Sequence, residues 1–146
     1  MIPYGGGGLS CGIAAVLRAL RPQTRIYACE VETAAPLHAA LAAGAPVPTD
    51  YRASFVDGIG GKGVLAEMWP LARRFLDGSL VVSLEAIAGA IRMLVERNRV
   101  VAEGAGAAPV AAALSGRAGP GKVVCVVSGG NIDLAKLALI LQGAVP

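Results

Sequence analysis

Four consecutive glycines, Gly5 to Gly8, stand directly before a segment of helical apolar spacing. Glycine loses more backbone freedom on folding than any other residue, so a row of four is costly to order. Bare main-chain N–H groups can converge on one anion, and the positive end of a following helix strengthens that attraction. We interpret the row as a cradle for a single phosphate group, with a flexible turn as the alternative.

Two other phosphate-binding motifs compete with this interpretation. A P-loop needs Lys and then Ser or Thr after its last glycine, but Ile13 and Ala14 stand there. The dinucleotide fingerprint G-x-G-x-x-G fails at the glycine row and is matched formally at Gly58, Gly60 and Gly63. Because that match follows a poor strand in a glycine-rich chain, the single-phosphate cradle is favoured.

A second glycine-rich site, the sequence SGGN at 128–131, follows the most β-branched run of the chain. In open α/β sheets, ligands lie at the carboxyl ends of the strands. The two glycine sites are therefore expected at one edge of a sheet. Taken alone, Ser128 could equally be a helix-capping serine.

The elements that must position these sites alternate along the chain. Apolar spacing, Pro and Gly predict helices at 9–20, 36–43, 64–76 with a kink or break at Pro70, 84–98 with Ser83 as N-cap, 109–115 and 134–142. Strands are predicted at 25–30, 79–83 and 122–128, with the end of another at 1–4. The run 122–128 is the strongest strand candidate, and its continuous apolar character predicts burial on both faces. This order predicts one α/β domain of three layers, with a mostly parallel sheet and helices on both faces.

Composition argues against several classes of protein. The chain has 146 residues, 55% of them hydrophobic, but no apolar run near the ~18 residues that a membrane span requires. We expect a cytoplasmic protein without a signal peptide. A net charge of +3 and 4% aromatic residues argue against nucleic-acid binding. Three widely spaced cysteines and one histidine argue against a zinc site and indicate reduced thiols.

Three segments together resemble the threonine/serine dehydratases, which belong to the tryptophan-synthase-β-like, fold-type II group of pyridoxal-phosphate enzymes. The segments are PYGGGGL at 3–9, AEGAGAAPVAAALSG at 102–116 and KVVCVVSGGNID at 122–133. The resemblance covers the whole chain and corresponds to the second half of that family's sequence. It implies that residues 1–146 form a single partial cofactor-binding domain. The N-terminal segment and the small domain, with the Schiff-base lysine, would lie outside it.

The resemblance also implies roles for individual residues toward pyridoxal 5'-phosphate. The phosphate would be bound by Gly5, Gly6, Gly7, Gly8 and Leu9. Ser128 would hydrogen-bond the pyridine nitrogen, with Gly129 beside it as a further cofactor-binding residue. Glu103 and Gly58 would border the ring. A neutral hydroxyl at Ser128 would leave the nitrogen unprotonated, which favours prompt loss of a β-hydroxyl over transamination.

A metal site is not expected from the same resemblance. Some relatives bind a divalent cation at positions that correspond to Glu30 and Ala34. Those relatives carry a further carboxylate where this chain has Pro36. Glu30 is therefore interpreted as a polar strand end rather than a metal ligand.

The activity implied by the resemblance is β-elimination of hydroxy amino acids to 2-oxo acids and ammonia. The lysines are Lys62, Lys122 and Lys136, and Lys62 is interpreted as a solvated loop residue, so the chain alone is expected to be inactive. The alternatives are a non-catalytic module that binds a phosphate ligand, a subunit that complements another, and a related racemase or β-replacement enzyme. An unpaired sheet edge would favour a homo-oligomer or association with a missing N-terminal half.

Overall fold

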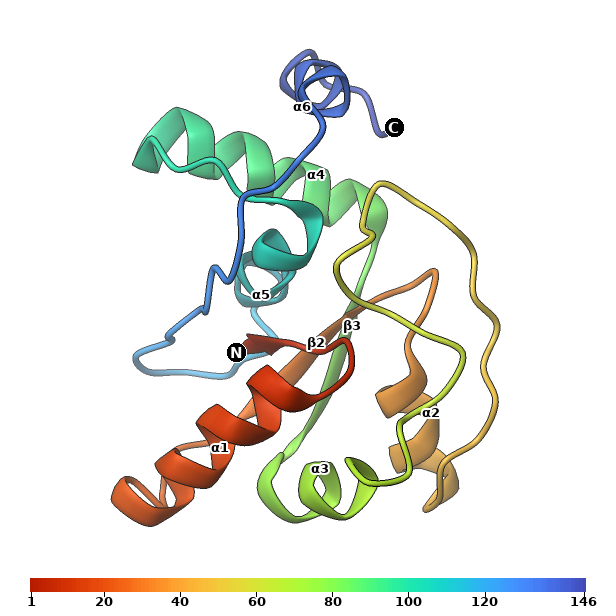
Figure 1. Cartoon of the computed structure of the whole chain (residues 1–146). Helices are drawn as coiled ribbons and strands as arrows, with labels where there is room; N and C mark the ends of the chain where they lie inside the picture. Colours follow the sequence, from red (N-terminus) through yellow and green to blue (C-terminus); the bar gives the residue numbers. More distant parts are fainter.

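Three short parallel strands run through the middle of the molecule in the order β1-β2-β3 (Figure 1). They are β1 (Ile2–Pro3), β2 (Tyr27–Val31) and β3 (Gly78–Val82). The computed structural model describes all 146 residues. Its sheet confirms the predicted α/β fold, because both strand pairs are parallel.

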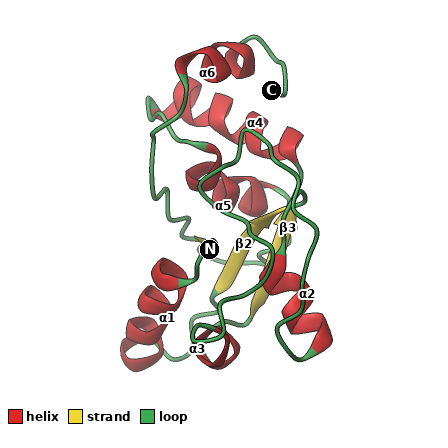
Figure 2. Ribbon diagram, turned by 45° about the vertical axis from the view of Figure 1, so that its right-hand side comes forward, coloured by secondary structure: helices red, strands yellow, loops and turns green.

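Helices cover both faces of this sheet (Figure 2). On one face lies α5, with α4, its π-helical continuation η1, and α6 stacked behind it; α1, α2 and α3 lie on the other face. Their bounds are α1 (Gly8–Leu20), α2 (Pro36–Ala43), α3 (Trp69–Phe75), α4 (Leu84–Met93), η1 (Leu94–Asn98), α5 (Gly104–Leu114) and α6 (Leu134–Leu141). None of these helices combines the length and the apolar character needed to cross a lipid bilayer.

Each face of the sheet has its own hydrophobic core. Successive side chains of a strand point to opposite faces. Accordingly, Ala28 of β2 packs with Ile2 and Tyr4 in the core shared with α1 to α3. Its neighbours Cys29 and Val31 pack in the larger core shared with α4 and α5. Two cores separated by one sheet give the three layers that the sequence predicts.

Several helix ends agree with their sequence signals. Helix α2 begins at Pro36 and is closed by Gly44, which takes a left-handed φ of 74°. Helix α4 is capped by Ser83, whose Oγ accepts a hydrogen bond from the N–H of Ala86 at 3.2 Å.

The prediction of a strand at 122–128 is wrong. This segment forms no sheet ladder: two main-chain hydrogen bonds, of Val124 and Val126, join it to Met1, the residue before β1. On this side of the sheet β1 has only two residues, so it offers little main chain for residues 122–128 to pair with. Expected burial on both faces also fails, since 75% of Val124 is exposed.

Two predicted helices have different bounds in the structure. The helix expected at 64–76 forms only as α3, which places Pro70 in its first turn, where a missing N–H costs no hydrogen bond. The helix expected at 109–115 begins five residues earlier, at Gly104, and carries Pro109 in its interior. Small residues around Pro109 are buried throughout, so packing of α5 against the sheet outweighs the lost bond.

Candidate functional site

A cavity of about 180 Å³ lies where β1 passes into α1, at the carboxyl end of the strand. It brings together segments that are far apart in the sequence: the glycine row, the turn at 58–59, the start of α5 and the end of the 122–128 segment. The lining residues are Pro3, Gly5, Gly6, Gly7, Gly8, Leu9, Ser10, Gly58, Ile59, Glu103, Ala105 and Ser128. All predicted cofactor residues except Gly129 are among them.

Unpartnered main-chain donors cluster at one end of this cavity. The N–H groups of residues 5–10 donate to no acceptor within the chain. The next amide along α1, that of Cys11, donates to the carbonyl of Gly7 at 2.9 Å. Gly7 caps α1 in a left-handed conformation, with φ 92°. Free N–H groups at the positive end of a helix bind an anion favourably. This end of the cavity therefore suits a phosphate group.

Close backbone packing explains why glycine is needed here. A Cβ on Gly5 would lie 3.3 Å from the carbonyl oxygen of Gly58, and one on Gly58 would lie 2.9 Å from the Cβ of Ala105. On Gly7, a side chain would combine the left-handed φ with a contact of 3.0 Å to Tyr4 Oη. Side chains at these positions would distort the walls of the cavity.

Glu103 and Ser128, the first residue of the SGGN sequence, also line the cavity. The N–H of Glu103 donates to the carbonyl of Gly129 at 3.1 Å. A Cβ on Gly129 would overlap the Glu103 carboxylate, and one on Gly106 would lie 2.6 Å from the Gly129 carbonyl oxygen. Gly129 thus lies behind the wall and positions Glu103 and Ser128, which face the cavity.

The residues present fit a ring that carries a phosphate. Amide donors stand at the α1 end, and a neutral hydroxyl, that of Ser128, stands on the wall formed by the second glycine site. The lining includes no lysine.

Glu30 lies away from this cavity and is fully buried in β2. Its carboxylate accepts hydrogen bonds from the N–H groups of Leu37 at 2.8 Å and His38 at 2.7 Å, and from the Ser79 hydroxyl. Burial raises the pKa of Glu30, and these hydrogen bonds lower it in part. The side chain caps the amino end of α2. Ala34, the other candidate of the weak metal site, forms an isolated bridge with Val31.

Sequence reasoning missed four lining residues: Pro3, Ser10, Ile59 and Ala105. Ser10 is the most informative of them. It is fully buried, and its Oγ donates to the carbonyl of Pro3 at 2.7 Å, which ties the first turn of α1 to β1. A serine inside a helical apolar pattern gives no signal of this role, because the bond depends on the turn between the two elements.

This fold and cavity define a class of protein. The family model described as "Pyridoxal-phosphate dependent enzyme" matches residues 1–129, and the chain belongs to this family. Pyridoxal phosphate is the cofactor of that family, as the sequence resemblance implied.

Individual relatives narrow the similarity further. The chain is 39% identical over 144 residues to the L-threonine ammonia-lyase of Geobacter sulfurreducens, covering 97% of this chain and 36% of the relative. It is similar to the solved threonine deaminase of T.th., with a TM-score of 0.85, 36% identity, and coverage of 90% of this chain and 48% of that one. Maize serine racemase gives a TM-score of 0.85 at 32% identity, with 97% and 46% coverage. The chain thus spans less than half the length of each of these relatives.

Proposed function

We propose that this chain is the cofactor-binding part of a pyridoxal-phosphate-dependent ammonia-lyase that eliminates water from threonine or serine, giving a 2-oxo acid and ammonia. The observation that carries the proposal is that the free amides of residues 5–10 line the same cavity as Ser128 and Glu103. Relatives named threonine ammonia-lyase and threonine deaminase support the substrate class.

Each residue of the cavity has a role in this proposal. The cofactor supplies an electron-accepting ring that stabilises negative charge at the α-carbon of a bound amino acid. The amides of Gly5 to Gly8 and Leu9 bind its phosphate, each contributing about 1.5–3 kcal/mol as a hydrogen bond to a charged group. The neutral hydroxyl of Ser128 would donate a hydrogen bond to the ring nitrogen and keep its own proton, so that nitrogen would stay uncharged. Glu103 and Gly58 border the ring and exclude water from it.

A charge introduced at Leu9 tests this assignment. Leu9 is 47% exposed, lines the cavity and lies in the first turn of α1, where a glutamate is compatible with the helix. Leu9→Glu should weaken binding of inorganic phosphate and of pyridoxal phosphate about tenfold or more by repulsion, whereas the neutral Leu9→Gln should retain it. Isothermal titration measures both ligands. Equal affinities for the three proteins would place the phosphate elsewhere.

Catalysis in this proposal requires a lysine that residues 1–146 do not bring to the cavity. None of Lys62, Lys122 and Lys136 lines the cavity. The chain alone is therefore expected to bind the cofactor without turnover. Formation of 2-oxo acid after mixing with a lysine-bearing N-terminal polypeptide of a relative would support the proposal. The free state of all three cysteines fits the reducing cytoplasm as the site of action.

A racemase is the second candidate, because maize serine racemase is similar over 97% of this chain. Both reactions begin with removal of the α-proton, so the cavity alone does not separate them. Chiral analysis of serine recovered from the complemented enzyme does: D-serine without 2-oxo acid would favour the racemase.

A further inference from the structure

The long connection between α2 and α3 carries one part of the lining of the glycine cavity. It contains no helix or strand, and in Figure 1 it runs from α2 toward α4 and returns to α3. Within it, residues 57–63 form a segment that we name the wall turn. Two residues of the wall turn, Gly58 and Ile59, line the cavity. The position of the wall turn therefore decides the shape of the site.

The wall turn passes from one hydrophobic core to the other. Ile59 is buried in the core shared with α4 and α5, whereas Val64 is buried in the core shared with α1 to α3. The four residues between them therefore pass around the end of the sheet. Three of the four, at positions 60, 61 and 63, are glycines, which have no side chain to pack and the greatest backbone freedom. This part of the turn must be held by its main chain.

Thr49 makes the hydrogen bonds that hold the wall turn. Its N–H donates to the carbonyl of Lys62 at 2.9 Å, and its Oγ1 donates to the carbonyl of Gly61 at 3.2 Å. No other hydrogen bond joins the main chain of residues 57–63 to the rest of residues 1–146. Because one of the two bonds comes from a side chain, a substitution can remove it and leave the other in place.

Close backbone packing carries the position of this segment to the cavity. A Cβ on Gly60, which has a φ of 91°, would lie 2.7 Å from the Cβ of Ala34. A Cβ on Gly58 would lie 2.9 Å from the Cβ of Ala105, at the start of α5. The wall turn thus lies directly against two neighbours, and a closely packed interior leaves little space to absorb a shift. Displacement of the turn at its bonded end would move Gly58 and Ile59.

We propose that Thr49 is a positioning residue of the cofactor cavity, whose hydroxyl fixes the wall turn so that Gly58 and Ile59 border the cofactor ring. The inference rests on the proposed function, because it takes the ligand to be pyridoxal phosphate. The phosphate of that ligand would be bound by the amides of residues 5–9, to which Thr49 donates no hydrogen bond. Loss of the Thr49 hydroxyl should therefore affect binding of the ring and spare binding of the phosphate.

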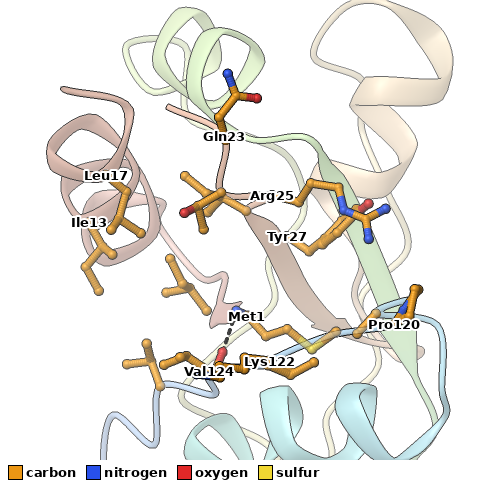
Figure 3. Close-up of a pocket in the computed structure, with 15 residues that line it drawn as sticks. Met1, Ile13, Leu17, Gln23, Arg25, Tyr27, Pro120, Lys122 and Val124 are labelled. Carbon is orange, nitrogen blue, oxygen red and sulfur yellow. Dashed lines mark hydrogen bonds between the residues drawn. The ribbon is translucent and has the colours of Figure 1, made fainter. Parts of the chain in front are cut away.

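A second cavity, of about 590 Å³, offers a different place for an aromatic ring. It lies between α1 and residues 122–126, beside Met1 (Figure 3). None of residues 44–63 lines this cavity, whereas Thr24 does. Matched substitutions of Thr49 and Thr24 therefore distinguish the two places.

Thr49→Val removes the hydroxyl and keeps the N–H and nearly the same side-chain size. We expect it to weaken binding of pyridoxal phosphate about fivefold, the effect of one lost hydrogen bond, and to leave binding of inorganic phosphate unchanged. Thr49→Ser keeps the hydroxyl and should bind both ligands as the native chain does. Thr24→Val is the matched control, because Thr24 is exposed and lies outside the wall turn, and it should also bind as the native chain does. Isothermal titration measures both ligands.

The outcomes separate this inference from the proposed function. Equal affinity of the native chain and Thr49→Val for pyridoxal phosphate would overturn the inference. An equal loss for both ligands would also overturn it, since general destabilisation has that effect. Weaker binding of pyridoxal phosphate in Thr24→Val alone would place the ring in the second cavity and contradict the role of Thr49. Binding that responds to Leu9→Glu but not to Thr49→Val overturns only the inference, whereas a native chain that binds neither ligand overturns the proposed function and the inference with it.

Discussion

Glu103 and Gly129 are in direct contact behind the glycine cavity, where the N–H of Glu103 donates to the carbonyl of Gly129 at 3.1 Å. The contact leaves no room for a side chain on Gly129, because a Cβ there would overlap the Glu103 carboxylate. This hydrogen bond joins the start of α5 to the SGGN sequence, although Glu103 and Gly129 are 26 residues apart in the chain. The position of both Glu103 and Ser128 thus depends on glycine at 129.

The first prediction concerns this contact. Gly129→Ala should displace the Glu103 side chain and weaken binding of pyridoxal phosphate about tenfold or more, with a stability loss of about 1–3 kcal/mol from overpacking. Isothermal titration and urea unfolding measure the two effects.

Gly89→Ala is the matched control for that substitution. Gly89 lies in α4, and a Cβ there would meet nothing within 4 Å. The control should stabilise the chain by about 0.5–1 kcal/mol through helix propensity and leave ligand binding unchanged. If Gly129→Ala behaved like this control, Gly129 would have no part in shaping the wall.

Local signals were enough to predict much of the fold. Pro36 and Gly44 delimit α2, and Ser83 caps α4, because each acts through the backbone of its own neighbourhood. The segment 122–128 differs, since a strand exists only through a partner. Its β-branched sequence has strand character, but the ladder depends on the length of β1, which residue types at 122–128 do not determine.

The same distinction applies to the candidate site. The glycine row, Gly58, Glu103 and Ser128 could be predicted because the resemblance carries their order along the chain, and the structure gathers them around one cavity. Ser10 could not be predicted, because its bond to Pro3 arises from the turn between β1 and α1. Gly129 is predicted to bind the cofactor; it is not among the lining residues, and the path of the backbone brings it against Glu103.

The second prediction concerns Ser10. Ser10→Ala removes the bond from Oγ to the Pro3 carbonyl, which is buried beneath the glycine row. It should cost about 1–3 kcal/mol of stability, because a buried acceptor loses its partner, and it should weaken phosphate binding as the loop loses its anchor. Urea unfolding and phosphate titration check both effects.

Ser115→Ala serves as the control for Ser10. Ser115 Oγ also donates to a main-chain carbonyl, that of Ala112, at 2.7 Å, but it lies at the end of α5 and outside the cavity. This variant should leave phosphate affinity unchanged. Equal phosphate affinities in both serine variants would show that Ser10 has no positioning role.

The third prediction concerns Tyr4, whose buried hydroxyl has no hydrogen-bond partner. Burial raises the pKa of Tyr4 to about 12, so the phenol stays neutral at physiological pH. Tyr4→Phe removes an unsatisfied polar atom and should stabilise the chain by about 1 kcal/mol. Tyr51→Phe, at a residue that is 44% exposed, should change stability little. A loss of stability in Tyr4→Phe, measured by urea unfolding, would indicate that a buried water pairs with the hydroxyl.

The fourth prediction concerns the pH dependence that Glu30 confers. Burial raises the pKa of Glu30 above its ordinary value of 4.5, so the folded chain holds this proton more tightly than the unfolded chain does. The contribution to stability is therefore complete below 4.5 and is lost as pH rises through the raised pKa. Glu30→Gln cannot titrate, so the free energy of unfolding of the native chain should fall with rising pH relative to that variant.

Urea unfolding from about pH 4 to about pH 8 measures this difference. Glu30→Gln should also be less stable at every pH by about 1–3 kcal/mol, because its single amide oxygen cannot accept from both Leu37 and His38. The exposed carboxylate of Glu85, in the first turn of α4, provides the control, and Glu85→Gln should retain the pH dependence of the native chain. A difference between the native chain and Glu30→Gln that stays constant across this range would mean that the Glu30 proton is held equally in the folded and unfolded states.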